Sequence, residues 1–189
     1  MSNDVNPRPK SGFRRLLGVA LIFVAGIAFA GLFNVGLEYT NRTEFCTSCH
    51  TMQTSLREYE QSKHYRNSLG VRAICTDCHV PEPFMAKMIT KIVQTKDVWH
   101  ELIGTIDTPE KFEARRWIMA NRVWQTMRAS DSRECRRCHV LANMDLGAQG
   151  REARAKHATA TEKGQTCIDC HQGIVHREPE EPPQGSLPD

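Results

Sequence analysis

The sequence predicts a mainly α-helical protein, with one N-terminal transmembrane helix followed by a small domain that has little or no β-sheet. Three observations support this prediction: a single long apolar run near the N-terminus, cysteines confined to four short motifs, and two segments with helical periodicity between the second and third motifs. At 189 residues, the chain has room for one globular domain and a short appendage. We expect a cytoplasmic segment at 1–15, an anchor helix at 16–37, an exported domain at 38–177 and a disordered acidic, proline-rich tail at 178–189.

The apolar run from Leu16 to Leu37 carries no charge and has the length that a helix needs to cross the hydrocarbon core of a bilayer. The preceding segment carries four basic residues against one acid, so we expect the N-terminus in the cytoplasm and the domain outside it. Ala28-Phe29-Ala30 resembles a signal-peptide cleavage site, but the run continues beyond Ala30, which favours a retained single-pass anchor. Small residues on this run could let a second helix approach, so a homo-oligomer through the anchor stays open.

All eight cysteines fall in Cys-x-x-Cys pairs, and a histidine follows each pair at once. The pairs are Cys46/Cys49, Cys75/Cys78, Cys135/Cys138 and Cys167/Cys170, and the histidines are His50, His79, His139 and His171. Two thiols at this spacing form thioethers to haem vinyl groups while the histidine reaches the iron. Zinc sites of four cysteines would explain the pairs but not the four histidines. The sequence therefore predicts four covalently bound haem c groups.

Two helices are expected between the second and third motifs. The first has an apolar face that ends near Gly104, made of Phe84, Met88, Ile92, Trp99 and Ile103. Thr108-Pro109-Glu110 predicts the start of the second, whose inward residues are Phe112, Met119, Val123, Trp124 and Met127. Because the exported domain has few other large apolar residues, these faces and the porphyrins must form most of a haem-packed multihaem cytochrome c core. Without haem, we expect this domain not to fold.

Four histidines lie outside the motifs: His64, His100, His157 and His176. Their number matches the number of irons, so each could supply a sixth ligand to one haem. The alternative for any one of them is a surface or capping histidine. The formal charge of +3 becomes roughly −5 once about two propionates per haem are counted. We therefore predict no nucleic-acid partner.

The chain is similar to the NapC/NirT family of membrane-anchored multihaem quinol dehydrogenases from the anchor to about His176. The resemblance is carried by the single span and by residues 44–52 (EFCTSCHTM), 75–81 (CTDCHVP), 104–108 (GTIDT) and 167–176 (CIDCHQGIVH). It implies a protein of the inner membrane, with its haem domain in the periplasm, that oxidises menaquinol or ubiquinol from the membrane pool. Its electrons would pass to a periplasmic reductase or that reductase's cytochrome subunit. The chain stops soon after the fourth motif, which favours nitrate or nitrite respiration over trimethylamine N-oxide respiration.

The resemblance also implies which histidines bind which irons. It assigns His64 to the iron of the fourth haem, His176 to that of the third and His157 to that of the second, although some relatives take a lysine from the partner protein at the second haem. For the first haem, it leaves open whether Met52 or His50 binds the iron.

The resemblance leaves the other face of the first haem open near an acidic residue, which Asp97 matches. Quinol oxidation releases two protons, so Asp97 is a candidate proton acceptor. Lys91 and Lys96 are expected on the same helix and could orient a quinone oxygen, although surface lysines are the alternative. His100 follows Asp97 by one helical turn and receives no role. The alternative function is an anchored electron carrier that receives electrons from another protein and never oxidises quinol.

Overall fold

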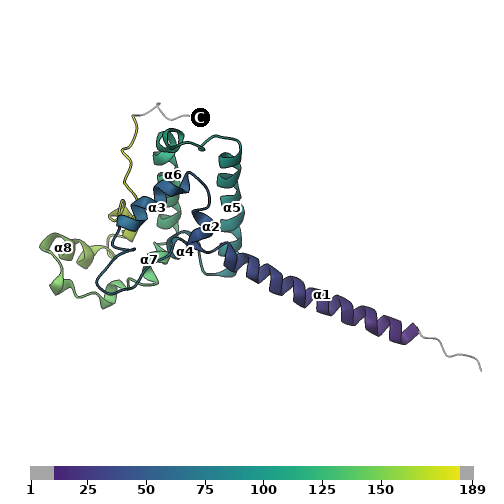
Figure 1. Ribbon diagram of the computed structural model, residues 1–189. Coiled ribbons are helices and arrows are strands. Elements are labelled where there is room, and N and C mark those ends of the chain that lie inside the picture. Colours follow the sequence, from purple (N-terminus) through teal and green to yellow (C-terminus); the bar gives the residue numbers. More distant parts are fainter. Residues whose placement is uncertain (1–10, 184–189) are drawn as a thin grey trace, which may run out of the picture. The chain divides into compact units, whose positions relative to one another are not determined.

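The computed structural model describes residues 11–183, and within this range it consists of helices, turns and loops without a strand (Figure 1). The predicted fold class is thus confirmed. Segments 1–15 and 178–189, for which we predict a cytoplasmic stretch and a disordered tail, lie largely outside the described range. The chain divides into two compact units, of which the first ends at Asn41 and the second begins at Arg42.

The first unit contains helix α1, Ser11–Tyr39. Residues 12–39 of this helix have a mean hydropathy of 2.6 and are long and apolar enough to cross a membrane. Helix α1 extends beyond the predicted span at both ends, which adds the basic pair Arg14 and Arg15 at its N-terminal end. Its apolar side chains are exposed within this chain, as a bilayer-facing helix requires.

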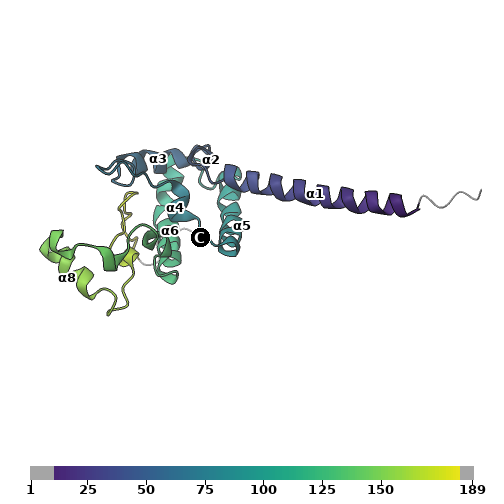
Figure 2. The ribbon, with the colours of Figure 1, turned by 90° about the horizontal axis from the view of Figure 1, so that it is seen from below.

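The second unit begins with short helices around the first two motifs and continues with two long helices. Its α-helices are α2 Thr43–Cys46, α3 Met52–Gln61, α4 Cys75–His79, α5 Phe84–Leu102, α6 Pro109–Ala129, α7 Arg133–Arg136 and α8 Arg151–Thr159. Three 3₁₀ turns complete the unit, η1 Leu141–Asn143, η2 Leu146–Ala148 and η3 Cys167–Asp169. In both views, α5 and α6 run alongside each other, and α8 lies on the far side of α6 from α5 (Figures 1 and 2).

Each attachment motif begins on a short helix, and two of these helices are capped by an acid inside the motif. The carboxylate of Asp77 accepts a hydrogen bond from the backbone N–H of Ile74 at 2.8 Å. Asp169 accepts bonds from the N–H of Thr166 at 2.7 Å and from its hydroxyl at 2.9 Å. These bonds satisfy N–H and O–H groups at the helix start, and they place the two cysteines of each motif on one turn.

Helix α6 begins at the predicted residue. The hydroxyl of Thr108 accepts a bond from the N–H of Lys111 at 3.3 Å, and Pro109 occupies the first helical position. Gly104, at φ 74°, ends α5 in the left-handed region that glycine adopts without strain.

The apolar face of α5 is not where we expected it. We predicted that it packs inward, but Phe84, Ile92 and Trp99 are 59%, 65% and 61% exposed. The opposite side of α5 carries the contacts to the domain: the hydroxyl of Thr51 donates to Glu101 at 2.5 Å, and the amide of Gln94 donates to the carbonyl of His79 at 3.4 Å. The polar anchors override the apolar period and turn the apolar face outward.

The protein alone buries very little apolar surface. Among the described residues, the buried hydrophobic side chains are Tyr59, Val80, Phe112 and Ile168. A domain of this size normally buries most of its large apolar residues. The shortage agrees with a domain whose core is completed by covalently attached groups.

Candidate haem-binding site

The four motifs lie against one another in chain order. A hydrogen bond between the thiols of Cys46 and Cys75 joins the first motif to the second, lowering the pKa of Cys75 to about 6 and raising that of Cys46. Cys78 and Cys135 are close enough that their charges interact, which joins the second motif to the third. Cys135 interacts likewise with Cys167 of the fourth motif.

The second cysteines of three motifs, Cys49, Cys138 and Cys170, are less enclosed than a haem-packed core leads us to expect. Cys49 is half-buried, whereas Cys138 and Cys170 are exposed on the surface of the chain. The physical reason is the small number of buried apolar side chains, which leaves little protein to cover these thiols. All eight cysteines are free thiols rather than disulfides, so both thiols of every motif remain available for thioethers. Covalent attachment at these three cysteines stays a prediction.

The contact between the third and fourth motifs is also made by a buried hydrogen bond. Ser132, fully buried just before the third motif, accepts a bond from the N–H of Ile168 at 3.2 Å. Ile168 is itself one of the buried apolar residues, so this bond and its side chain hold the two motifs together.

Three of the motif histidines face a second histidine ring. The ring centres are 6.1 Å apart for His64 and His139, 6.2 Å for His79 and His176, and 5.8 Å for His157 and His171. Nitrogens bound to one metal lie about 2 Å from it and ring centres roughly 1 Å further out, so two axial imidazoles have centres on the order of 6 Å apart. The pairs therefore fit bis-histidine haem irons.

Protonation favours the same role for these rings. Burial lowers the pKa of His79 to about 4 and also lowers the pKa values of His64, His171 and His176, so these imidazoles are neutral at neutral pH. The neutral ring is the form that binds a metal. The Nδ1 atoms of His64 and His176 are buried without a hydrogen-bond partner.

The observed pairs differ from those that the resemblance implies. The structure brings His64 to the third motif, His176 to the second and His157 to the fourth. The resemblance assigns the same three histidines to the fourth, third and second haems, respectively. The same ligands thus occur in a different permutation, and the difference can be measured on single variants.

A cavity of about 500 Å³ adjoins two of these histidines, His139 and His157. Its wall is mainly apolar and includes Val140, Leu141 and Met144. Its volume lies within the range of cofactor sites. Within residues 11–183, no three His, Cys, Asp or Glu side chains converge as a metal cluster, which the zinc alternative requires.

The first motif has a different environment. No ring pair within the described residues includes His50 or His100. His50 and Met52 are both exposed, so either can reach an iron at this motif. Thr51, between them, is buried and bonds Glu101 on α5. Glu101 was missed in the sequence because a single acid on a mixed helix gives no signal for a contact 50 residues away.

The predicted quinol residues lie on α5. Asp97 pairs with Arg122 of α6 at 3.5 Å, and its side chain is 55% exposed. The burial that we assumed for this carboxylate is thus absent, and a positive partner takes its place. Lys91 lies near Cys46 of the first motif, and partial burial lowers its pKa, whereas Lys96 is exposed.

The chain matches the family model described as the NapC/NirT cytochrome c family, N-terminal region, over residues 8–181. It is 58% identical to a tetraheme cytochrome-c type protein of Allochromatium vinosum, over 90% of this chain and 93% of that protein. It is 47% identical to the denitrification system component NirT of Stutzerimonas stutzeri, over 94% of each. It is also 49% identical to the cytochrome c-type protein NapC of Escherichia coli, over 88% of this chain and 85% of NapC.

These matches cover the anchor helix and all four motifs, and the residues of the motifs suit covalent haem attachment. The histidine pairs and the sparse apolar core point to the same cofactor. The chain is a membrane-anchored c-type cytochrome, and it belongs to the NapC/NirT cytochrome c family.

Proposed function

We propose that this protein oxidises quinol beside its first motif and delivers the electrons to a periplasmic reductase of nitrate or nitrite respiration. The observation that carries the proposal is the contact of α5 with the first motif, through Thr51 and Glu101. This contact holds a helix with an ionisable pair and an exposed apolar face against one haem attachment site. Family membership supports the proposal, as does the similarity to a denitrification component.

The site on α5 has the groups that quinol oxidation needs. Quinol becomes quinone by losing two electrons and two protons, and haem irons, when attached, supply one-electron acceptors. The carboxylate of Asp97 can accept the first proton at an Oδ atom, and Arg122 holds this side chain in place at 3.5 Å. Because Asp97 is half exposed, it can release that proton to water and accept the second one.

The exposed apolar face of α5 can take the ring and tail of the substrate. Ile92, Trp99 and Leu102 are each more than half exposed on this helix. Quinol is an apolar molecule with two polar oxygens, so an apolar surface beside one acid and one base matches it chemically. Lys91 and Lys96, on the same helix, are the candidate partners of a quinone oxygen.

The order of the motifs supports a route for the electrons. Because each motif lies against the next one in chain order, electrons that enter at the first motif can pass through the second and third to the fourth. We infer that the reductase or its cytochrome subunit docks near the fourth motif. In this scheme the N-terminus lies in the cytoplasm and the haem domain in the periplasm of a cell with an inner membrane.

The test is the change of Asp97 to Asn in the full-length protein with its four haems. This variant keeps the size of the side chain and removes the base, so the rate of oxidation of a quinol analogue should fall at least tenfold. Dithionite should still reduce all four haems. The matched control is Asp131→Asn, which removes an exposed carboxylate that is also paired with an arginine, Arg136, but lies away from α5.

A parental rate in Asp97→Asn would remove this residue from the mechanism and make His100 the next one to replace. If a reduced partner cytochrome reduced the haems but no quinol analogue did, the protein would be an anchored electron carrier instead. That result would refute the proposal as a whole.

A further inference from the structure

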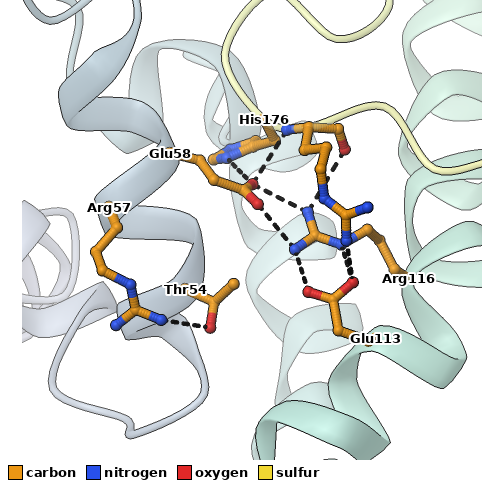
Figure 3. A network of polar contacts seen from close by, with 7 residues as sticks. Thr54, Arg57, Glu58, Glu113, Arg116 and His176 are labelled. Atoms are coloured by element: carbon orange, nitrogen blue, oxygen red, sulfur yellow. Dashed lines mark hydrogen bonds and ion pairs between the residues drawn. The ribbon is translucent and has the colours of Figure 1, made fainter.

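A buried ionic cluster surrounds the histidine that follows the fourth motif (Figure 3). Its centre is Arg116 of α6, which is 6% exposed. The guanidinium grips Glu113 with bonds of 2.9 Å from Nε and 2.6 Å from Nη2. It also grips Glu58 of α3, with Nη1 at 2.9 Å and Nη2 at 2.8 Å from the two carboxylate oxygens. One arginine thus holds two carboxylates, each through two contacts.

The same cluster holds the segment that carries His176. Glu58 Oε2 accepts a bond from the backbone N–H of Arg177 at 3.1 Å, and Arg116 Nη1 lies 3.5 Å from the carbonyl of Arg177. The side chain of Arg177 bonds Glu113. Three elements that are distant in sequence, α3, α6 and the segment after the fourth motif, are therefore tied together at one histidine.

Glu58 is also the acid that faces the ring of this histidine. Nδ1 of His176 is buried without a hydrogen-bond partner and lies 3.7 Å from Glu58 Oε2. This distance is longer than a hydrogen bond, and a small turn of the ring closes it. The ring centre lies 6.2 Å from that of His79 of the second motif. One face of His176 thus points toward the second haem iron and its Nδ1 toward a carboxylate.

We propose that Glu58 and Arg116 are positioning residues that set the reduction potential of the haem attached at Cys75 and Cys78, through His176. A carboxylate that accepts the Nδ1–H of a metal-bound histidine fixes the ring and makes it a stronger donor to the metal. A stronger donor stabilises ferric over ferrous iron and lowers the potential. Arg116 acts in the opposite direction, because it draws the negative charge of Glu58 toward itself.

Burying these charges needs a reason beyond stability. A buried ion pair is often no more stabilising than apolar residues of the same volume, because both partners lose their hydration. Here the domain has very few buried apolar side chains, yet it buries an arginine between two acids beside a candidate iron ligand. The inference rests on the assignment of His176 to the second haem and is independent of the quinol site.

The experiment is a potentiometric titration of the full-length, four-haem protein, monitored by low-temperature paramagnetic resonance. Glu58→Gln keeps the shape but removes the charge, so the potential of one low-spin haem should rise by at least 59 mV, the value of a tenfold change in a one-electron equilibrium. Arg116→Gln should shift the same haem downward. His176→Ala identifies that haem independently, because the loss of one axial ligand makes its iron high-spin.

Two matched controls separate tuning from general loss of charge. Glu60→Gln makes the same change two residues along α3, on another side of the helix, and Arg57→Gln removes an exposed arginine of α3 that bonds Thr54. Both should leave all four potentials unchanged. If Arg116→Gln failed to retain four haems, Arg116→Lys would replace it and should give a smaller downward shift.

Opposite shifts in the Glu58 and Arg116 variants are the signature of the proposal. A merely structural role would disturb the ligand in both variants and move the potential in the same direction, and that result would overturn it. Unchanged potentials in Glu58→Gln would overturn it as well. If the shifts occurred at a haem that His176→Ala leaves low-spin, the ligand assignment would be wrong rather than the cluster's influence.

Discussion

Changing Ser132 to Ala tests whether one buried hydroxyl fastens the third motif to the fourth. Its oxygen accepts the N–H of Ile168 at 3.2 Å, and neither group has access to water. The loss of this partner leaves a buried donor unpaired, which costs about 1–3 kcal/mol. For a domain of this size, a loss of about 2 kcal/mol lowers the melting temperature by roughly 8 °C. Differential scanning calorimetry of the holoprotein in detergent measures this shift.

The backbone of Ser132 adds a second forecast. This residue has φ 47°, in the left-handed region, where a non-glycine residue is strained by roughly 1–2 kcal/mol. Ser132→Gly loses the hydroxyl but relieves that strain, so it should melt between the parent and Ser132→Ala. Thr126→Ala, which removes an exposed hydroxyl on α6, should stay within about 0.5 kcal/mol of the parent. The reasoning fails if alanine melts at or above the temperature of glycine.

Three further outcomes are expected. His64→Ala should turn the haem of the third motif high-spin, as the ring geometry requires, and a change at the fourth haem would support the resemblance instead. Intact mass should show four haems and an N-terminus upstream of Ala30, and a start at residue 31 would mean that the anchor is removed. Hydrogen bonding to Arg116 lowers the pKa of Glu113, so the stability that Glu113 adds is present above its unfolded value and is lost as the pH falls. Glu113→Gln should therefore destabilise the protein at pH 7 but little at the acid end of the same calorimetric series.

The local signals in the sequence predicted local structure well. The apolar length predicts a membrane-spanning helix, and the Thr108-Pro109 pair predicts the first residue of α6. The four motifs predict haem c because covalent attachment and iron ligation need residues within five positions. None of these predictions requires a contact between distant segments.

Contacts between distant segments could not be predicted in the same way. The face of α5 is decided by Thr51 and Gln94, which bond the polar side of the helix to the domain, although the apolar period alone favours the other orientation. The cluster of Glu58 and Arg116 joins residues 58 positions apart, and neither residue has a distinctive neighbour in the sequence. The histidine pairs have the same origin, because any of several permutations satisfies a count of ligands.

Reduction by quinol is the most direct test of the proposed function. The full-length protein, placed in liposomes that contain a menaquinol analogue, is followed at the haem absorption bands by stopped flow, and a periplasmic nitrate or nitrite reductase is then added with its substrate. The account predicts that the quinol analogue reduces the haems, that the reductase reoxidises them, and that Asp97→Asn slows only the first phase. Haems that dithionite or a reduced cytochrome reduces, but that the quinol analogue leaves oxidised, would contradict it.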